Sequence, residues 1–147
     1  MKKNYIKFIK QIKKNNLLMF SIGCVYLFFG ILKFFSSLSP AEDIAIQTIN
    51  RLTLNLIPSN ISLTILAIWE TAIGILLIIN KFNKTILILA LAHIILTFTP
   101  LLLVPEATFS STTHTPTLLG QYIFKNIIIV AALLTQLQNK KVIYAKS

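Results

Sequence analysis

Four long apolar stretches dominate the chain, and each is long enough to cross a bilayer as a helix. They cover residues 17–36, 61–80, 85–104 and 118–137. The hydrocarbon core of a bilayer is about 30 Å thick, and about 20 apolar residues of α-helix are needed to cross it. The pattern predicts an all-α fold, an integral membrane four-helix bundle that occupies residues 17–138. Basic cytoplasmic segments are expected on either side of it, at residues 1–16 and 139–147.

The connection between the first two stretches has a different pattern. Its apolar side recurs every three or four positions, with Ile44, Ala45, Thr48, Ile49 and Leu52 on one face. Charged and amide side chains fall on the other face. This periodicity predicts a short amphipathic helix in the first outer loop, either at the membrane surface or covering the bundle. Ser39, Pro40 and Glu42 precede it in the order of a capping box with proline at the first helical position.

The lysines indicate how the chain crosses the membrane. Of the 14 lysine and arginine residues, all but three lie before the first stretch, between the second and third stretches, or after the fourth. Four crossings place these three segments on the same side. Cytoplasmic loops carry an excess of lysine and arginine. We therefore expect both termini to be cytoplasmic.

Composition excludes several classes of protein. Apolar residues make up 55% of the chain, charged residues only 12%, and the mean hydropathy is +0.77. Soluble domains have about 25% charged residues, so a cytosolic enzyme, a disordered tail and a nucleic-acid binder are all excluded, despite the net charge of +10. A single cysteine excludes a disulfide scaffold and a thiolate zinc site. The expected partner is the lipid bilayer, and no nucleic acid is expected.

Ionisable residues inside the apolar stretches are the candidate functional groups. There are four of them: Lys33, Glu70, His93 and Lys125. Such residues are costly in hydrocarbon and usually face the interior of the protein, where they mark function. A helical rise of about 1.5 Å per residue puts Glu70 and His93 about 15 Å deep, near the midplane. The two lysines lie in the outer half, with side chains long enough to reach inward.

Each of these residues shares a helical face with small or polar neighbours. Small residues allow membrane helices to approach closely, so the simplest assembly points the four faces at one axis. We then expect one polar pocket, opening outward, whose ligand-binding residues are Lys33, Glu70, His93, Thr97, Tyr122 and Lys125. Two lysines against one glutamate leave about one positive charge. This favours an anionic or electron-rich ligand, such as a quinone, an oxyanion or a lipid phosphate.

Structural explanations exist for the same residues. Lys33 and Lys125 could extend to the outer surface, and Glu70 could form a structural ion pair with a lysine. His93 could be a hydrogen-bonded core residue, or Glu70 and His93 could carry protons together. Metal and bis-histidine haem sites are not expected, because His93 and His114 lie at different depths. No catalytic residue set is predicted.

Several segments resemble the DoxX-like family of small membrane proteins. Residues 30–33 (GILK) are similar to its glycine-to-lysine motif, and residues 70–78 (ETAIGILLI) to its glutamate–glycine motif. Residues 39–53, 97–106 and 116–126 are similar to further segments of its members, so the resemblance covers nearly the whole chain. The four ionisable residues inside the stretches match motif positions.

The resemblance implies a four-helix protein of the bacterial inner membrane. The best-known branch of the family is a subunit of a thiosulfate:quinone oxidoreductase, and other branches are linked to oxidative-stress resistance. The leading hypothesis is a small subunit that binds a quinone-like or anionic ligand and supports a redox or oxidative-stress complex. Quinone is then the candidate cofactor, and other membrane redox subunits or further copies of the chain are candidate partners. The alternatives are a non-catalytic structural or assembly factor and a small transporter.

Overall fold

The computed structural model describes residues 2–35, 39, 41–81 and 83–144, and this part of the chain is predominantly helical. The elements are α1 (Lys2–Leu32), α2 (Glu42–Leu52), α3 (Ser59–Ile78), α4 (Lys84–Leu96), α5 (Pro100–Leu103), α6 (Pro105–Thr108) and α7 (Leu118–Tyr144). An isolated bridge between Phe109 and Pro116 closes the loop before α7. The predicted all-α fold class is confirmed.

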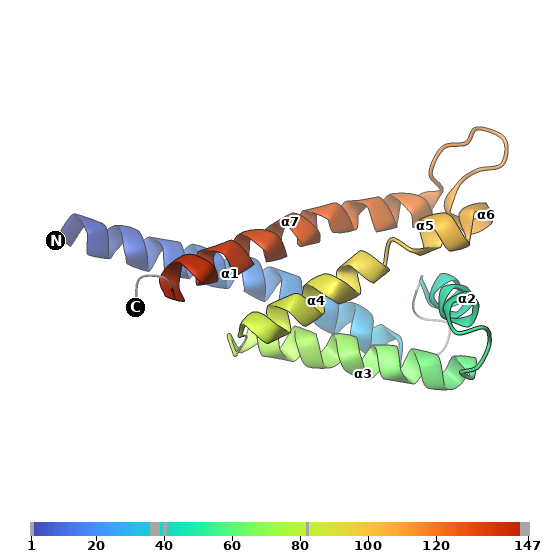
Figure 1. The fold of residues 1–147 in the computed structure, drawn as a ribbon, viewed down its shortest axis with the longest axis horizontal. Coiled ribbons are helices and arrows are strands. Elements are labelled where there is room, and N and C mark those ends of the chain that lie inside the picture. Colours follow the sequence, from blue (N-terminus) through green and yellow to red (C-terminus); the bar gives the residue numbers. More distant parts are fainter. Residues whose placement is uncertain (1, 36–38, 40, 82, 145–147) are drawn as a thin grey trace.

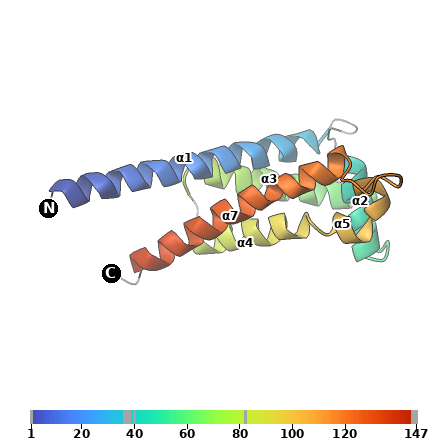
Figure 2. The same cartoon turned by 90° about the horizontal axis from the view of Figure 1, so that it is seen from above.

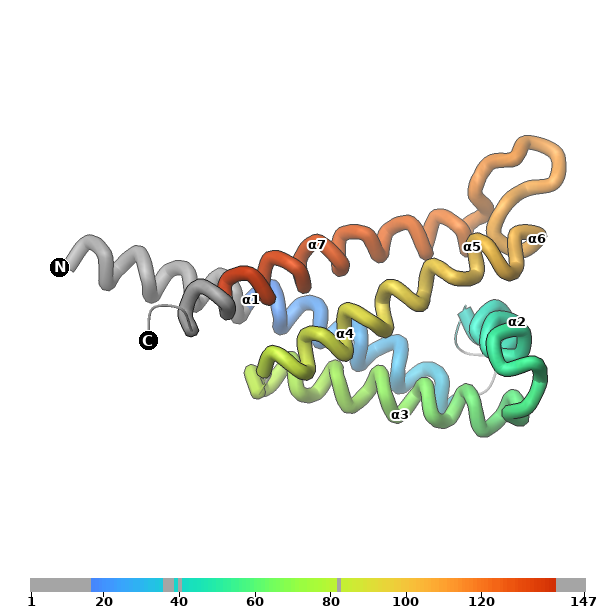
Figure 3. The backbone as a smooth tube through the Cα atoms, in the orientation of Figure 1, coloured from blue at the N-terminus to red at the C-terminus, as the bar shows by residue number. Residues whose placement is uncertain are grey.

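The long helices α1, α3, α4 and α7 run lengthwise through the molecule (Figures 1 and 2). The turn between α3 and α4 lies at the same end as the start of α1 and the end of α7. The short helices α2, α5 and α6 lie at the opposite end, and the loop of residues 109–117 projects beyond α6 (Figure 3). The three lysine-rich segments are therefore at one end of the molecule, and the side of the membrane that this end faces stays a prediction.

Three helical segments in the described residues are long and apolar enough to cross a membrane. They are Ser59–Ile78, Lys84–Leu103 and Leu118–Asn139. The apolar part of α1, Leu17–Leu32, is shorter, because α1 ends at Leu32 and not at the predicted residue 36. Apolar helices of this length are typical of proteins that reside in lipid. The fourth crossing stays a prediction.

The third apolar stretch is not the continuous helix that its sequence predicts. Helix α4 ends at Leu96, a turn follows, and α5 begins at Pro100. Proline has no N–H, so it cannot donate to the carbonyl four residues earlier. Thr99 bonds to that Leu96 carbonyl instead, with its backbone N–H at 3.1 Å and its hydroxyl at 2.7 Å. The break places Thr97 in the turn, at the end of α4.

Helices α1 and α3 approach each other most closely, at glycines. A Cβ added to Gly74 would lie 2.6 Å from the backbone nitrogen of Leu27, and one added to Gly30 would lie 2.7 Å from that of Thr71. Only glycine permits these contacts, as expected from the small residues on these helical faces. A core cluster continues this interface toward α4 and α7 through Met19, Ile22, Tyr26, Ile73, Leu77, Leu87, Ala90, Ile94 and Leu133.

The predicted amphipathic helix is present as α2, with Ile44 and Thr48 buried. Its predicted cap is wrong. The residue before the helix is Ala41, which makes no side-chain cap, and the Ser39 hydroxyl is buried without a hydrogen-bond partner in the described part of the chain. The backbone does this work instead, since the Glu42 N–H donates to the Ser39 carbonyl at 3.1 Å. Pro40 lies outside the described residues.

Candidate functional site

The carboxylate of Glu70, on α3, lies at the centre of the polar residues. Its Oε2 is 2.5 Å from Lys33 Nζ, and its Oε1 is 3.5 Å from His93 Nε2. The three side chains come from α1, α3 and α4, and all are largely buried, with exposed fractions of 5% for Lys33, 9% for Glu70 and 12% for His93. Burial of this kind requires good geometry, because the two charges lose their hydration.

Lys33 follows the last residue of α1, and its side chain points inward. Its ammonium group donates to Glu70 and also to the Phe29 carbonyl, at 3.4 Å, and lies 6.0 Å from the centre of the Phe29 ring. Of the two orientations that the sequence allows, extension to the surface is therefore wrong for this residue. The ion pair ties the end of α1 to the middle of α3.

Tyr26 extends the arrangement on the other side of His93. Its hydroxyl lies 3.2 Å from His93 Nδ1 and donates to the Ala90 carbonyl at 2.9 Å. We call Lys33, Glu70, His93 and Tyr26 the polar chain. Tyr26 is seven residues before Lys33, on the same helical face, but it is not among the site residues predicted from the sequence. The signal was present, since a buried tyrosine needs a partner for its hydroxyl.

A cavity of about 730 Å³ lies beside the polar chain, between α1, α4 and α7. The six predicted site residues all line it: Lys33, Glu70, His93, Thr97, Tyr122 and Lys125. Its remaining walls are mostly apolar, including Phe29 on α1 and Ile123 on α7. The structure therefore brings the predicted residues to one cavity from four helices, although they do not all contact one another.

Thr97 belongs to a second polar contact, which joins α4 to α7. Asn126 Nδ2 donates to Thr97 Oγ1 at 2.9 Å, and Thr97 donates to the Ile94 carbonyl at 2.6 Å. Asn126 also lines the cavity. Sequence analysis did not select it, because its neighbour Lys125 carries the more conspicuous charge.

Lys125 and Tyr122 lie at the edge of the cavity. Both side chains are exposed, and Lys125 Nζ lies 5.7 Å from the centre of the Tyr122 ring. Lys125 lines the cavity but does not pair with Glu70, so only one of the two lysines neutralises the carboxylate. Lys33 and Glu70 neutralise each other in the interior, and the additional positive charge is at the rim, where water or lipid headgroups can solvate it.

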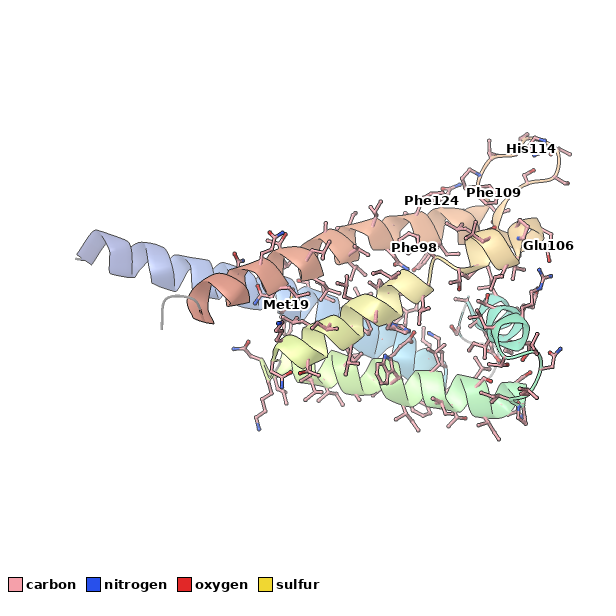
Figure 4. All side chains as sticks on the ribbon, viewed as in Figure 1. Met19, Phe98, Glu106, Phe109, His114 and Phe124 are labelled. Atoms are coloured by element: carbon pink, nitrogen blue, oxygen red, sulfur yellow. The ribbon has the colours of Figure 1, made fainter. Side chains whose placement is uncertain are left out.

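A smaller cavity, of about 420 Å³, lies between α3 and α4. Its walls are apolar apart from Ser62 and His93, and they include Trp69 and Ala92. His93 lines both cavities, as do Leu66 and Leu96. The second histidine, His114, is exposed on the loop before α7 (Figure 4), far along the chain from α4. Across residues 2–35, 39, 41–81 and 83–144, no group of three histidine, cysteine, aspartate or glutamate residues could hold a metal ion.

Helix α2 covers the end of the larger cavity, where Ile44, Thr48 and Leu52 line it. Arg51, in the last turn of α2, donates to the Leu103 carbonyl and pairs with Glu106 Oε1 at 2.5 Å. A hydrogen bond from its own backbone amide, followed by the Arg51 guanidinium, holds the pKa of Glu106 below its usual value. We call the Arg51–Glu106 pair the latch, because it fastens α2 to the segment after α4.

Comparison of the chain with protein-family models, with curated proteins and with solved structures finds no match.

Proposed function

We propose that the protein binds a quinone-like amphiphile in the larger cavity, with the head group against the polar chain. The observation that carries this proposal is a cavity of about 730 Å³ whose mostly apolar wall contains a buried ion pair and a histidine. Ligand cavities are typically about 300–1,000 Å³, mostly apolar, with a few placed polar groups that orient the ligand.

The charges of the cavity favour a neutral head group in its interior. Lys33 and Glu70 cancel, so a buried anion would have no full countercharge there. An ammonium group has three N–H donors, and Lys33 uses two, on Glu70 and Phe29. The third can donate to a ligand carbonyl, as a quinone requires. An anionic group fits the rim better, beside Lys125.

The topology and the cellular location of the protein are part of the proposal. We infer that the apolar part of α1 is a fourth crossing, that the fold is a four-helix bundle of the DoxX-like type, and that both termini are cytoplasmic in a bacterial inner membrane. The resemblance of its motifs and the grouping of the lysine-rich segments at one end support this. As a subunit, it would supply ligand binding to a redox or oxidative-stress complex.

A binding measurement tests the proposal. The protein in lipid nanodiscs should bind a short-chain benzoquinone saturably, and quinones should be found by mass spectrometry among the lipids retained after purification. Glu70→Gln removes the charge that orients Lys33. A hydrogen bond to a charged group contributes about 1.5–3 kcal/mol, so the Kd should rise about ten- to a hundredfold.

A second variant tests the cavity and leaves the Lys33–Glu70 ion pair intact. Ala45 lines the cavity from α2, so Ala45→Trp should fill the cavity and abolish binding while the protein remains monodisperse. The matched control is Ala131→Trp, the same change on an exposed position of α7 outside the cavity. Equal binding by both tryptophan variants, or no saturable binding by the unaltered protein, would contradict the proposal.

A structural or assembly role is the second candidate. The ion pair joins α1 to α3 beside the glycine contacts, so it could serve only to fix how these helices pack. In that case Glu70→Gln should fail to accumulate in the membrane, and no quinone should accompany the unaltered protein.

A further inference from the structure

The Tyr26 hydroxyl is within hydrogen-bond distance of two partners. One is the Ala90 carbonyl at 2.9 Å, and the other is His93 Nδ1 at 3.2 Å. A hydroxyl has one proton and can donate to only one of them. In the other contact the hydroxyl oxygen has no proton to give and can only accept. The direction in which the hydroxyl proton points therefore determines which nitrogen of His93 carries hydrogen.

The shorter contact is the one to Ala90. If the Tyr26 hydroxyl donates its hydrogen bond to that carbonyl, His93 Nδ1 must carry a proton and donate a hydrogen bond to the tyrosine oxygen. In a neutral imidazole Nε2 then has only a lone pair. That lone pair faces Glu70 Oε1 at 3.5 Å, and two acceptors at this distance repel unless a proton lies between them.

We propose that the polar chain is a buried proton-binding site, which holds one proton between Glu70 Oε1 and His93 Nε2. In the loaded state Tyr26 donates to Ala90, Nδ1–H donates to Tyr26, and the added proton forms an N–H or O–H bond in the contact with Glu70. In the empty state one proton has left for water, Nε2–H faces Glu70, and the Tyr26 hydroxyl has turned to donate to Nδ1. The loaded state therefore satisfies every contact of the polar chain, whereas the empty state exchanges the Tyr26–Ala90 hydrogen bond for one from Tyr26 to His93 Nδ1.

The groups that face this site make the exchange possible. Lys33 occupies Glu70 Oε2 and leaves Oε1 for His93. The titratable and charged side chains around the cavity are Tyr26 and Lys33 from α1, Glu70 from α3, His93 from α4, and Tyr122 and Lys125 from α7. Helix α2 contributes uncharged side chains only. The four side chains of the polar chain have a net charge of +1 in the loaded state and of zero in the empty state. Proton uptake therefore sets the charge that the cavity presents.

Nuclear magnetic resonance of histidine nitrogens can observe this directly. The chain contains two histidines, and His114→Gln removes the exposed one and thereby assigns the other. In protein labelled with ¹⁵N-histidine, in micelles, His93 should change protonation over roughly pH 4 to 9. The Nδ1 resonance should report N–H at the acidic end and a hydrogen-bonded lone pair at the basic end.

Three variants distinguish this site from a merely structural histidine. In Glu70→Gln the carboxylate is gone while the Lys33 charge remains, so His93 should become charged only at a pH lower by roughly one unit or more. Lys33→Met should move the same transition in the opposite direction. Tyr26→Phe should change the Nδ1 resonance and leave Nε2 in contact with Glu70.

Tyr122→Phe is the control for the last variant, since it removes an exposed hydroxyl that lines the same cavity without contacting His93. It should leave both His93 resonances unchanged. The proposal is overturned if His93 keeps one protonation state over the whole range, or if its transition is the same in Glu70→Gln as in the unaltered protein. Neither result depends on whether a quinone binds.

Discussion

Helix α1 meets α3 and α7 in opposite ways. Against α3 it presents Gly23 and Gly30, so that the backbones approach until no Cβ could fit between them. Against α7 it presents Phe29, whose ring lies edge-on to Tyr122 with 5.7 Å between the ring centres. Glycine closes one interface completely, whereas a pair of aromatic rings holds the other apart. The larger cavity lies on the second side.

This difference explains how a chain with so few polar residues can keep an open site. Membrane helices associate mainly by van der Waals packing and interhelical hydrogen bonds, because lipid is as apolar as their side chains. The α1–α3 interface has both, in its glycines and its Lys33–Glu70 pair. Helix α7 is fixed to α4 by the Asn126–Thr97 hydrogen bond, and this allows it to remain apart from α1 beside the cavity.

The largest effect is expected from breaking the ion pair that closes the α1–α3 interface. Lys33→Met leaves the Glu70 charge buried without its partner, which typically costs about 3–5 kcal/mol. The free energy of unfolding in mixed micelles should fall by that amount. The double variant Lys33→Met, Glu70→Leu removes both charges and should recover most of the loss. A double variant as unstable as the single one would show that the pair is not the source of the effect.

The glycine contacts of the same interface should give the next largest effect. Gly74→Ala places a methyl group 2.6 Å from the Leu27 nitrogen, and this backbone cannot move aside without separating α1 from α3. Overpacking of this kind costs about 1–3 kcal/mol, measured as above. Ala131→Val, on the exposed face of α7, is the control and should change stability little. If both variants are equally stable, the glycines do not determine the close approach.

The α4–α7 contact should be the weaker of the two polar connections. Interhelical hydrogen bonds in membranes contribute about 0.6 kcal/mol in double-mutant cycles. A cycle of Asn126→Leu and Thr97→Val should therefore give a coupling energy of this size, much smaller than that of the ion pair. A coupling as large as that of Lys33 and Glu70 would contradict the expected order of the two polar connections.

The sequence predicts the helices well because their physics is local. A run of about 20 apolar residues has few alternatives to a helix in lipid, and the face that carries Glu70 and Gly74 follows from helical spacing alone. The break after Leu96 also has a local cause, in Pro100, although the apolar pattern runs straight through it. The predicted capping box is wrong because the backbone N–H of Glu42 donates to the Ser39 carbonyl and not to the Ser39 hydroxyl.

The pairing of side chains between helices could not be predicted in the same way. Both lysines lie at similar depths, and nothing local shows that Lys33 turns inward while Lys125 stays at the rim. That choice depends on which helix is adjacent and at what distance. Tyr26 and Asn126 were missed for the same reason, since their roles arise from partners 67 and 29 residues away along the chain.

The smallest effect should come from the latch, which lies outside the membrane segments at the cavity end covered by α2. The pKa of Glu106 is lower in the folded protein than in the unfolded chain, first because its own backbone amide donates to it and then because of Arg51. The ionised carboxylate, and the latch with it, therefore contributes its full stability above the usual carboxyl pKa. That contribution is lost as the pH falls through the lowered value. The side chains are about half exposed, at 48% and 58%, so added salt should weaken the pair as well.

Thermal unfolding should therefore occur at a slightly lower temperature at acidic pH, and Glu106→Gln should remove that part of the pH dependence. Asp43→Asn, which removes an exposed carboxylate on the same helix α2, is the control. If Asp43→Asn flattens the profile as much as Glu106→Gln, the acid sensitivity belongs to the net charge of this end of the molecule and not to the latch.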